Sequence, residues 1–99
     1  MYEATILKFR ERPPGSAPIS AQHHVPGNSL RTINIEDAPT AKLYKDAEAV
    51  LVQFIQKLDD GTYIGEISGF EPSLVLEFNE MKVGEPIRFS EQHVFGLTE

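Results

Sequence analysis

The sequence predicts one domain of the α+β or mainly β class: a curled antiparallel sheet of five or six strands that resembles a small barrel and carries one short helix. Three observations support this expectation. Short apolar runs repeat with the period of two that a pleated strand imposes, and turns containing Gly or Pro separate them. The 99 residues, 40% of them hydrophobic, suffice for a single core. Because the chain has no Cys, packing rather than disulfides must hold this core.

The first third of the chain predicts a strand followed by a long loop. In residues 2–10, Leu7 and Phe9 alternate with Lys8 and Arg10, as in a strand. Residues 11–29 form a Pro/Gly-rich segment with four Pro, which lack a backbone donor, and two Gly, which favour turns. Structureless connections of this length are uncommon in compact domains and are often functional or mobile. We therefore expect a mobile loop that is a candidate binding segment.

The middle of the chain predicts a short strand, a short helix and a central strand. Residues 30–35 alternate polar and apolar side chains. Asp37 can cap a helix and Pro39 suits its first turn, which favours a helix over residues 38–47. The run 49–55 is apolar on both faces and rich in β-branched residues, as expected for a strand that is covered on both sides. We expect this run at the centre of the sheet.

The second half predicts further strands joined by tight turns. The Asp60-Gly61 pair favours a hairpin between the run 49–55 and a strand over 62–67, in which Gly65 indicates a bulge or a close backbone approach. Strands are also expected over 73–78 and 86–89, and Ser90 can then open one helical turn. The predicted core consists of apolar positions on these strands: Val50, Val52, Phe54, Ile64, Ile67, Leu74, Leu76, Phe78, Ile87 and Phe89.

The charge and its distribution narrow the classes of partner. A formal net charge of −6 argues against nucleic acid, because nucleic-acid binding draws most of its affinity from Lys and Arg. Residues 1–58 carry seven basic and six acidic side chains, whereas residues 59–99 carry two basic and nine acidic ones. No apolar run approaches the roughly 20 residues of a membrane span, and the N-terminus has no signal-peptide pattern. We therefore expect no membrane partner and a cytoplasmic location.

Few residues are candidates for chemistry. His23, His24 and His93 could in principle place three imidazoles on zinc, but adjacent histidines point apart along an extended chain and no helical zinc spacing occurs. Fifteen carboxylates make accidental pairs inevitable, and the sequence has neither a Gly-rich phosphate loop nor a nucleophile motif. We therefore expect no metal, no cofactor and no enzyme activity.

A basic stripe is the main candidate surface. On a strand, Lys8, Arg10 and Arg12 would point to one side because they lie two residues apart. Such stripes commonly protect the edge strand of a sheet from aggregation, and they can also bind an acidic partner or a phosphate. Together with His23 and His24 of the long loop, these three residues form the candidate partner surface.

The second half of the chain also carries a family resemblance. The resemblance rests on three segments and one proline: YIGEI (63–67), MKVGEPIRF (81–89), HVF (93–95), and Pro72 between the first two. Over residues 49–97 the chain resembles a small bacterial family of unknown function, whose members occur alone and beside ankyrin repeats. Glu85 stands where that family has Asp. The resemblance implies a strand, a turn and a final strand, and it implies no catalytic residue.

These observations favour a non-enzymatic binding or regulatory module in a bacterial or phage cytoplasm. It would engage a protein partner through the loop 11–29, the basic stripe or an exposed sheet edge. One alternative is an acidic inhibitor or immunity-type protein that presents its carboxylate-rich C-terminal half to a basic enzyme site. Another is a small metal-dependent enzyme that uses His23, His24 and His93. The identity of the partner and the oligomeric state stay open.

Overall fold

The computed structural model describes residues 1–13, 20–25, 28–32, 34–73 and 75–98, and for residues 20–32 it describes the backbone alone. Within these residues the chain is mostly β, with two 3₁₀ turns and no α-helix. The strands are β1 (Tyr2–Glu3), β2 (Ser20–Val25), β3 (Asn28–Thr32), β4 (Thr40–Lys45), β5 (Glu48–Lys57), β6 (Tyr63–Glu71), β7 (Glu77–Phe78), β8 (Met81–Lys82), β9 (Pro86–Phe89) and β10 (Val94–Thr98). The 3₁₀ turns are η1 (Ile35–Asp37) and η2 (Glu91–His93).

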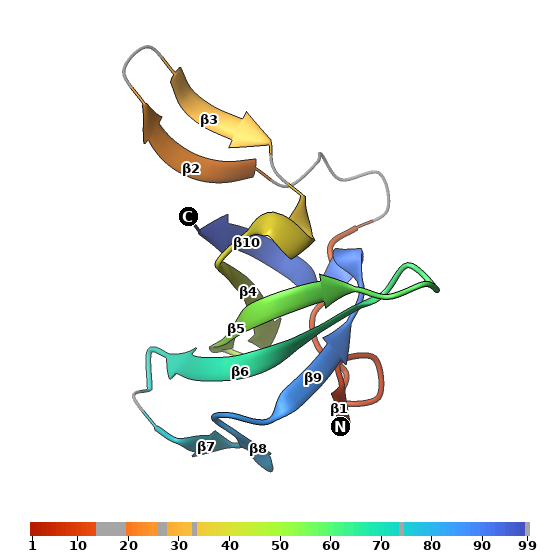
Figure 1. Cartoon of the computed structure of the whole chain (residues 1–99). Coiled ribbons are helices and arrows are strands. Elements are labelled where there is room, and N and C mark those ends of the chain that lie inside the picture. The colour runs from red at the N-terminus through yellow and green to blue at the C-terminus, as the bar shows by residue number, and fades with distance from the viewer. Residues whose placement is uncertain (14–19, 26–27, 33, 74, 99) are drawn as a thin grey trace.

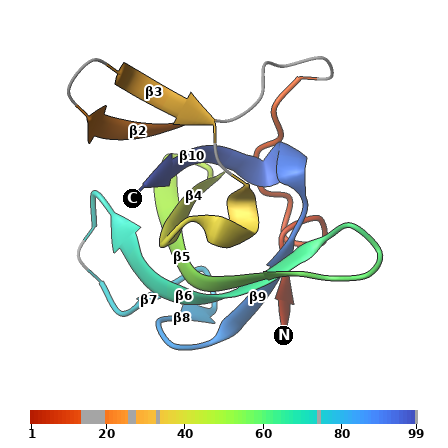
Figure 2. The same cartoon turned by 45° about the horizontal axis from the view of Figure 1, so that its top comes forward.

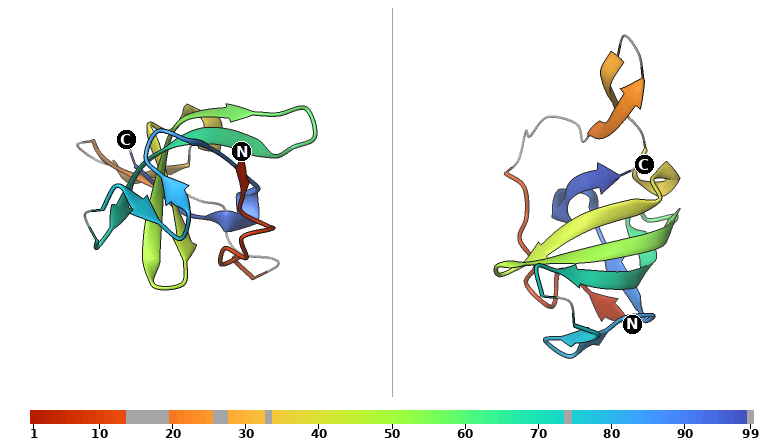
Figure 3. Two further views of the ribbon diagram at one scale, coloured as in Figure 1. Left: turned by 90° about the horizontal axis from the view of Figure 1, so that it is seen from below. Right: turned by 90° about the vertical axis from the view of Figure 1, so that its left-hand side faces the viewer.

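Eight strands form one mixed sheet in the order β1-β9-β6-β5-β4-β10-β2-β3, and β7 and β8 form a separate pair (Figure 1). The first six strands of this order make up the body of the molecule. The β2–β3 hairpin is attached to β10 through the residue pair Leu97–Ala21 and projects away from the body (Figure 3). Of the two predicted classes, α+β or mainly β, the described residues show the mainly β one, and the main sheet has eight strands where five or six were expected.

The sheet departs from the predicted antiparallel arrangement at two places. β1 pairs with β9, and β2 pairs with β10, in parallel. The partners in both pairs are far apart in the sequence, so no tight turn imposes the antiparallel direction on them. The described pairings leave β1 and β3 at open edges, and they do not close the sheet into a barrel.

The segment 38–47, which was expected to be a helix, forms strand β4 instead. Ala41 and Leu43 are fully buried, whereas Lys42 and Tyr44 are half-buried on the opposite face, which is the period of two of a strand. β4 pairs with β5 along its whole length. A helix of about ten residues is marginal without tertiary contacts, so pairing with the central strand outweighs the helix signal.

Two expectations for the first third of the chain are wrong. The strand predicted over 2–10 is limited to β1, and residues 4–8 form turns with Lys8 at a φ of 58°, which lets Ala4 and Phe9 both enter the core. The loop predicted over 11–29 contains β2 and the start of β3, which pair as a hairpin. Neither β2 nor β3 contains a proline, so no donor is missing from their ladder on that account. Residues 14–19 and 26–27 lie outside the described residues.

Five of the ten predicted core positions are confirmed as buried. Ile64 and Phe78 are half-buried, and Leu74 lies outside the described residues. The expected positions that are buried are Val50, Val52, Ile67, Ile87 and Phe89. The expectation is wrong for Phe54 and Leu76, whose exposed fractions are 72% and 79%. The strand expected over 73–78 is reduced to β7, which pairs with β8 rather than with β6.

Candidate functional site

The most unusual feature of the sheet is a β-bulge in β5. The ladder between β5 and β6 shifts register after Gln53, so that Phe54 and Ile55 both face Gly65. A Cβ atom on Gly65 would overlap Val52 Cγ1 and would lie 3.0 Å from the carbonyl oxygen of Gln53. The bulge therefore requires glycine at this position, which confirms the close backbone approach predicted there.

The bulge turns Phe54 toward solvent. Its φ is 54°, in the left-handed region, which costs a bulky L-residue about 1 to 2 kcal/mol. Its side chain is 72% exposed. The pairing of β5 with β4 ends at Gln53–Thr40, so the rest of β5, the following turn and the start of β6 project beyond β4 (Figure 2). We call residues 54–64 the β5–β6 arm.

Polar contacts hold the turn of the β5–β6 arm against β9. The hydroxyl and the backbone N–H of Thr62 donate to Asp60 Oδ1 at 2.6 and 3.0 Å, and Arg88 forms an ion pair with the other oxygen of this carboxylate. Arg88 Nε also donates to Thr62 Oγ1 at 3.1 Å. The hydrogen bonds from Thr62, and then the guanidinium, hold the pKa of Asp60 below its ordinary value. The arm is therefore fixed by its own polar network.

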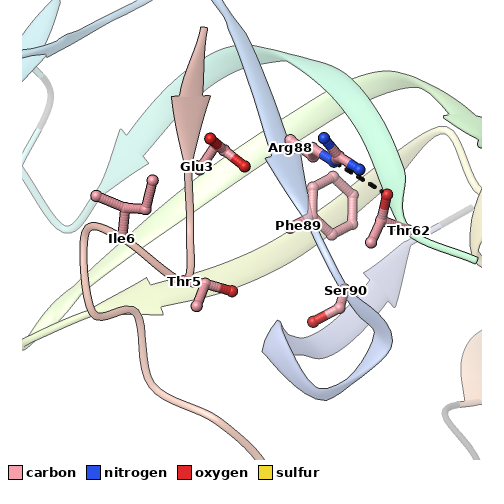
Figure 4. A pocket seen from close by; sticks show the side chains of 7 residues that line it. All are labelled: Glu3, Thr5, Ile6, Thr62, Arg88, Phe89 and Ser90. Atoms are coloured by element: carbon pink, nitrogen blue, oxygen red, sulfur yellow. Dashed lines mark hydrogen bonds between the residues drawn. The ribbon is translucent and has the colours of Figure 1, made fainter. Parts of the chain in front are cut away.

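A hollow of about 350 Å³ lies beside this network (Figure 4). Its lining residues are Glu3, Thr5, Ile6, Thr62, Arg88, Phe89 and Ser90. The Arg88 side chain turns toward Thr62, and its guanidinium already bonds Thr62 and Asp60. Because Glu3 and Asp60 offset the charge of Arg88, the hollow has no strong preference for an anion.

His93 is buried next to β10, with an exposed fraction of 1%. Its Nδ1 accepts a hydrogen bond from the backbone N–H of Ser90 at 3.1 Å and lies 2.9 Å from Ser90 Oγ. Burial lowers the pKa of His93, and the carboxylate of Glu11 opposes this effect. The ring is therefore neutral near pH 7, and its Nδ1 is engaged within the fold.

Of the three histidines considered as metal ligands, only His93 has a side chain that the structure describes. His23 and His24 lie on β2, but their side chains are outside the description. In the described part of the chain, no group of three or more His, Cys, Asp or Glu side chains could hold a metal ion. The expected absence of a metal, a cofactor and an enzyme activity stays a prediction.

The basic residues do not form the straight stripe that a strand would give. Lys8 sits in a left-handed turn, which separates its direction from that of Arg10 and Arg12. Arg12 Nη2 donates to the carbonyl oxygen of Glu91 at 3.2 Å and lies 3.6 Å from the Glu91 carboxylate. Lys8 and Arg10 are exposed, whereas the Arg12 side chain packs against η2. A role in partner binding for these residues stays a prediction.

The sequence contained signals for the turn and the bulge of the arm, at Asp60-Gly61 and Gly65, and no signal for its exposed aromatic. Gly65 indicated a bulge, but a bulge can direct any of its residues outward, and Phe54 lies in a run that reads as core on both faces. Only the register between β5 and β6 identifies Phe54 as the exposed residue.

Comparison with known proteins gives no match: no family model fits the chain, and no curated protein or solved structure is significantly similar to it. The resemblance of residues 49–97 to the small bacterial family therefore stays a prediction. Within the described residues, no helix has the length and apolar character to span a membrane.

Proposed function

We propose that this chain is a non-enzymatic binding module that engages a protein partner through the β5–β6 arm, with Phe54 as the anchor. The observation that carries the proposal is the exposure of Phe54 at a positive φ, on a bulge that Gly65 makes room for. Strained backbone conformations persist where the surrounding structure imposes them, and they cluster at binding and switch sites.

The energetics of the arm fit a binding role. An exposed Phe gains about 1.5 to 3 kcal/mol when a partner buries it, and aromatic anchors dominate many interfaces. The network of Asp60, Thr62 and Arg88 holds the arm in place, which lowers the entropy that binding must overcome. A bulge can also protect a sheet edge from aggregation, but a polar residue would serve that purpose without exposing an aromatic ring.

The remaining parts of the proposal come from the sequence. Lys8 and Arg10, with His23 and His24 on β2, are kept as a second contact region for the partner. We also propose a bacterial or phage cytoplasm as the location, and a sheet that curls toward a small barrel. The alternative of an acidic inhibitor is supported by the negative charge of residues 59–99. The metal-dependent alternative would need His23 and His24 to meet the buried His93.

Photo-crosslinking in the source cells tests the proposal. A photoreactive phenylalanine analogue replaces Phe54 in one variant and Ile6 in the other, since these side chains are equally exposed at 72% and 70%. We expect a protein adduct from position 54 and none of the same mass from position 6. The adduct is identified, and the purified partner is then titrated with Phe54→Ser and Ile6→Ser.

The loss of a buried Phe should weaken the affinity for this partner about tenfold or more in Phe54→Ser, because about 1.4 kcal/mol corresponds to a factor of ten. Ile6→Ser should bind like the wild type. Either the lack of an adduct at position 54 or an unchanged affinity of Phe54→Ser would remove the arm from the proposal.

A further inference from the structure

The ring of His93 helps to close the 3₁₀ turn η2. The backbone N–H of His93 donates to the carbonyl oxygen of Ser90 at 3.0 Å, and the backbone N–H of Ser90 donates to His93 Nδ1 at 3.1 Å. A backbone N–H can only donate, so Nδ1 is an acceptor and the ring proton lies on Nε2. The turn is therefore built around a neutral imidazole.

A proton on Nδ1 would break this arrangement. An imidazolium carries a proton on both ring nitrogens, so Nδ1 could no longer accept from the N–H of Ser90. Ser90 Oγ lies 2.9 Å from Nδ1 and could accept the new proton, but the N–H of Ser90 would lose its partner. Nε2 is buried and has no hydrogen-bond partner among the described residues. Because unpaired donors and charges are costly when buried, the charged ring is compatible only with an opened turn.

The turn η2 also holds part of the segment between β1 and β2. The backbone N–H of Arg12 donates to the carbonyl oxygen of Gln92 at 2.7 Å, and Arg12 Nη2 donates to the carbonyl oxygen of Glu91 at 3.2 Å. The Glu91 carboxylate lies 3.6 Å from the same guanidinium. A change in the conformation of η2 therefore reaches Arg12, from which the chain continues toward the β2–β3 hairpin.

Charges on both sides of η2 act on the ring. Burial lowers the pKa of His93, and the carboxylate of Glu11 opposes this effect. Glu91, the first residue of η2, carries a second carboxylate, and Arg12 offsets its charge. Burial therefore outweighs the carboxylates, and the ring stays neutral in the closed turn.

The strands near η2 add no second group that titrates in the same range of pH. β10 has no ionisable side chain, and Arg88 on β9 forms an ion pair with Asp60. On β6, burial raises the pKa of Tyr63, and the charges of Glu36 and Glu91 raise it further, so its hydroxyl stays neutral. Histidine is the side chain that ordinarily titrates between about pH 5 and 8, so we assign a change of η2 in this range to His93.

We propose that η2 is a pH-sensitive latch, which holds Arg12 against the body of the molecule while His93 is neutral and releases it when acid protonates the ring. The contact that switches is the one between the N–H of Ser90 and His93 Nδ1, because a proton on Nδ1 leaves two donors facing each other. The opening is local, because the ring reaches water once the single turn of η2 unwinds, and β4 and β5 stay paired. The inference does not depend on the role of Phe54.

Amide hydrogen exchange of the full chain, followed by NMR at about pH 7.5 and 5.5, tests the latch. The N–H groups of His93 and Arg12 report on the turn, and that of the fully buried Val50 reports on global unfolding. We expect the protection factors of the first two to fall by up to about tenfold at the lower pH, because opening takes up one proton and the ordinary pKa of His is about 6.5. This opening should not respond to dilute urea, because it exposes little surface.

Two results would overturn the latch. One is equal protection of His93 and Arg12 at both pH values. The other is a pH-dependent loss of protection that follows urea in the same way as the loss at Val50, because protonation of the ring then requires unfolding of the whole domain.

Variants of two residues identify the group that takes up the proton. In His93→Gln the amide oxygen can still accept from the N–H of Ser90 but does not titrate, so the protection of Arg12 should be the same at both pH values. If this variant does not fold, His93→Phe fills the buried site with a ring that does not titrate, and the same result is expected. Glu91→Gln is the matched control, because it removes the carboxylate beside Arg12 and keeps the imidazole, so the response to pH should remain. A response that survives without His93, or that disappears in Glu91→Gln, assigns the proton to another group and overturns the latch.

Discussion

Replacement of Gly65 by Ala should destabilise the protein strongly, because the β5–β6 bulge is built around its missing side chain. The new Cβ would overlap Val52 Cγ1 and lie 3.0 Å from the Gln53 carbonyl oxygen. Val52 is fully buried and the oxygen belongs to the backbone, so neither can move without disturbing the core or the ladder. Overpacking of this kind costs about 1 to 3 kcal/mol. Since 1 kcal/mol shifts the melting temperature of a domain of this size by roughly 4 to 8 °C, we expect a decrease of about 4 to 24 °C.

Gly69 on the same strand provides the matched control. A Cβ there would meet Leu51 Cδ1 at 3.9 Å, which is an ordinary van der Waals contact. Gly69→Ala should therefore change the free energy of unfolding by no more than about 0.5 kcal/mol. Thermal melts of both variants, followed by far-UV circular dichroism, make the comparison. Indistinguishable melting temperatures for Gly65→Ala and Gly69→Ala would refute the packing described for the bulge.

Three further predictions concern individual side chains. Phe54→Gly should leave the free energy of unfolding unchanged or raise it by up to about 1 kcal/mol, because glycine adopts a positive φ without strain. A decrease of about 3 kcal/mol or more in urea unfolding would mean that Phe54 is buried. The pKa of His93 is lower in the folded state than in the unfolded chain. As the pH falls below about 6.5, the unfolded chain therefore binds a proton first, and the free energy of unfolding should fall by at most about 1.4 kcal/mol per pH unit. Equal urea midpoints at about pH 7.5 and 5.5 would contradict a buried neutral ring. NMR titration should find the pKa of Asp60 below its ordinary value, and Thr62→Val should raise this pKa. An unchanged pKa in Thr62→Val would contradict the hydrogen bond that the Thr62 hydroxyl donates to Asp60.

The local features of the second half of the chain could be predicted because local chemistry determines them. Asp60 and Gly61 tolerate the turn that joins β5 to β6, and Gly61 adopts a φ of 87°. Alternation places Ile87 and Phe89 inward on β9, where both are buried. These features need only neighbours a few residues away, and the sequence contains those neighbours.

The segment 38–47 shows where local signals failed. Asp37 and Pro39 are compatible with a helix start, but Asp37 ends the 3₁₀ turn η1 and Pro39 precedes a strand. Leu43 and Ala41 fit the period of a strand as well as a face of a short helix. The strand prevails because β5 pairs with this segment across the turn at residues 46–47, and because β10, which lies beyond the range of a local pattern, pairs with its other edge.

The sequence by itself indicated an α+β or mainly β chain, identified Val50, Val52, Ile67, Ile87 and Phe89 as core residues, and marked Gly65 as a bulge or a close backbone approach. Only the tertiary structure decided which apolar residues face water. Phe54 and Leu76 have the same apolar character as their buried neighbours, and their exposure depends on where β4 ends and on how β7 turns onto β8. Burial depends on what packs against a side chain, and that is set by the register of the strands and by where each neighbouring strand ends.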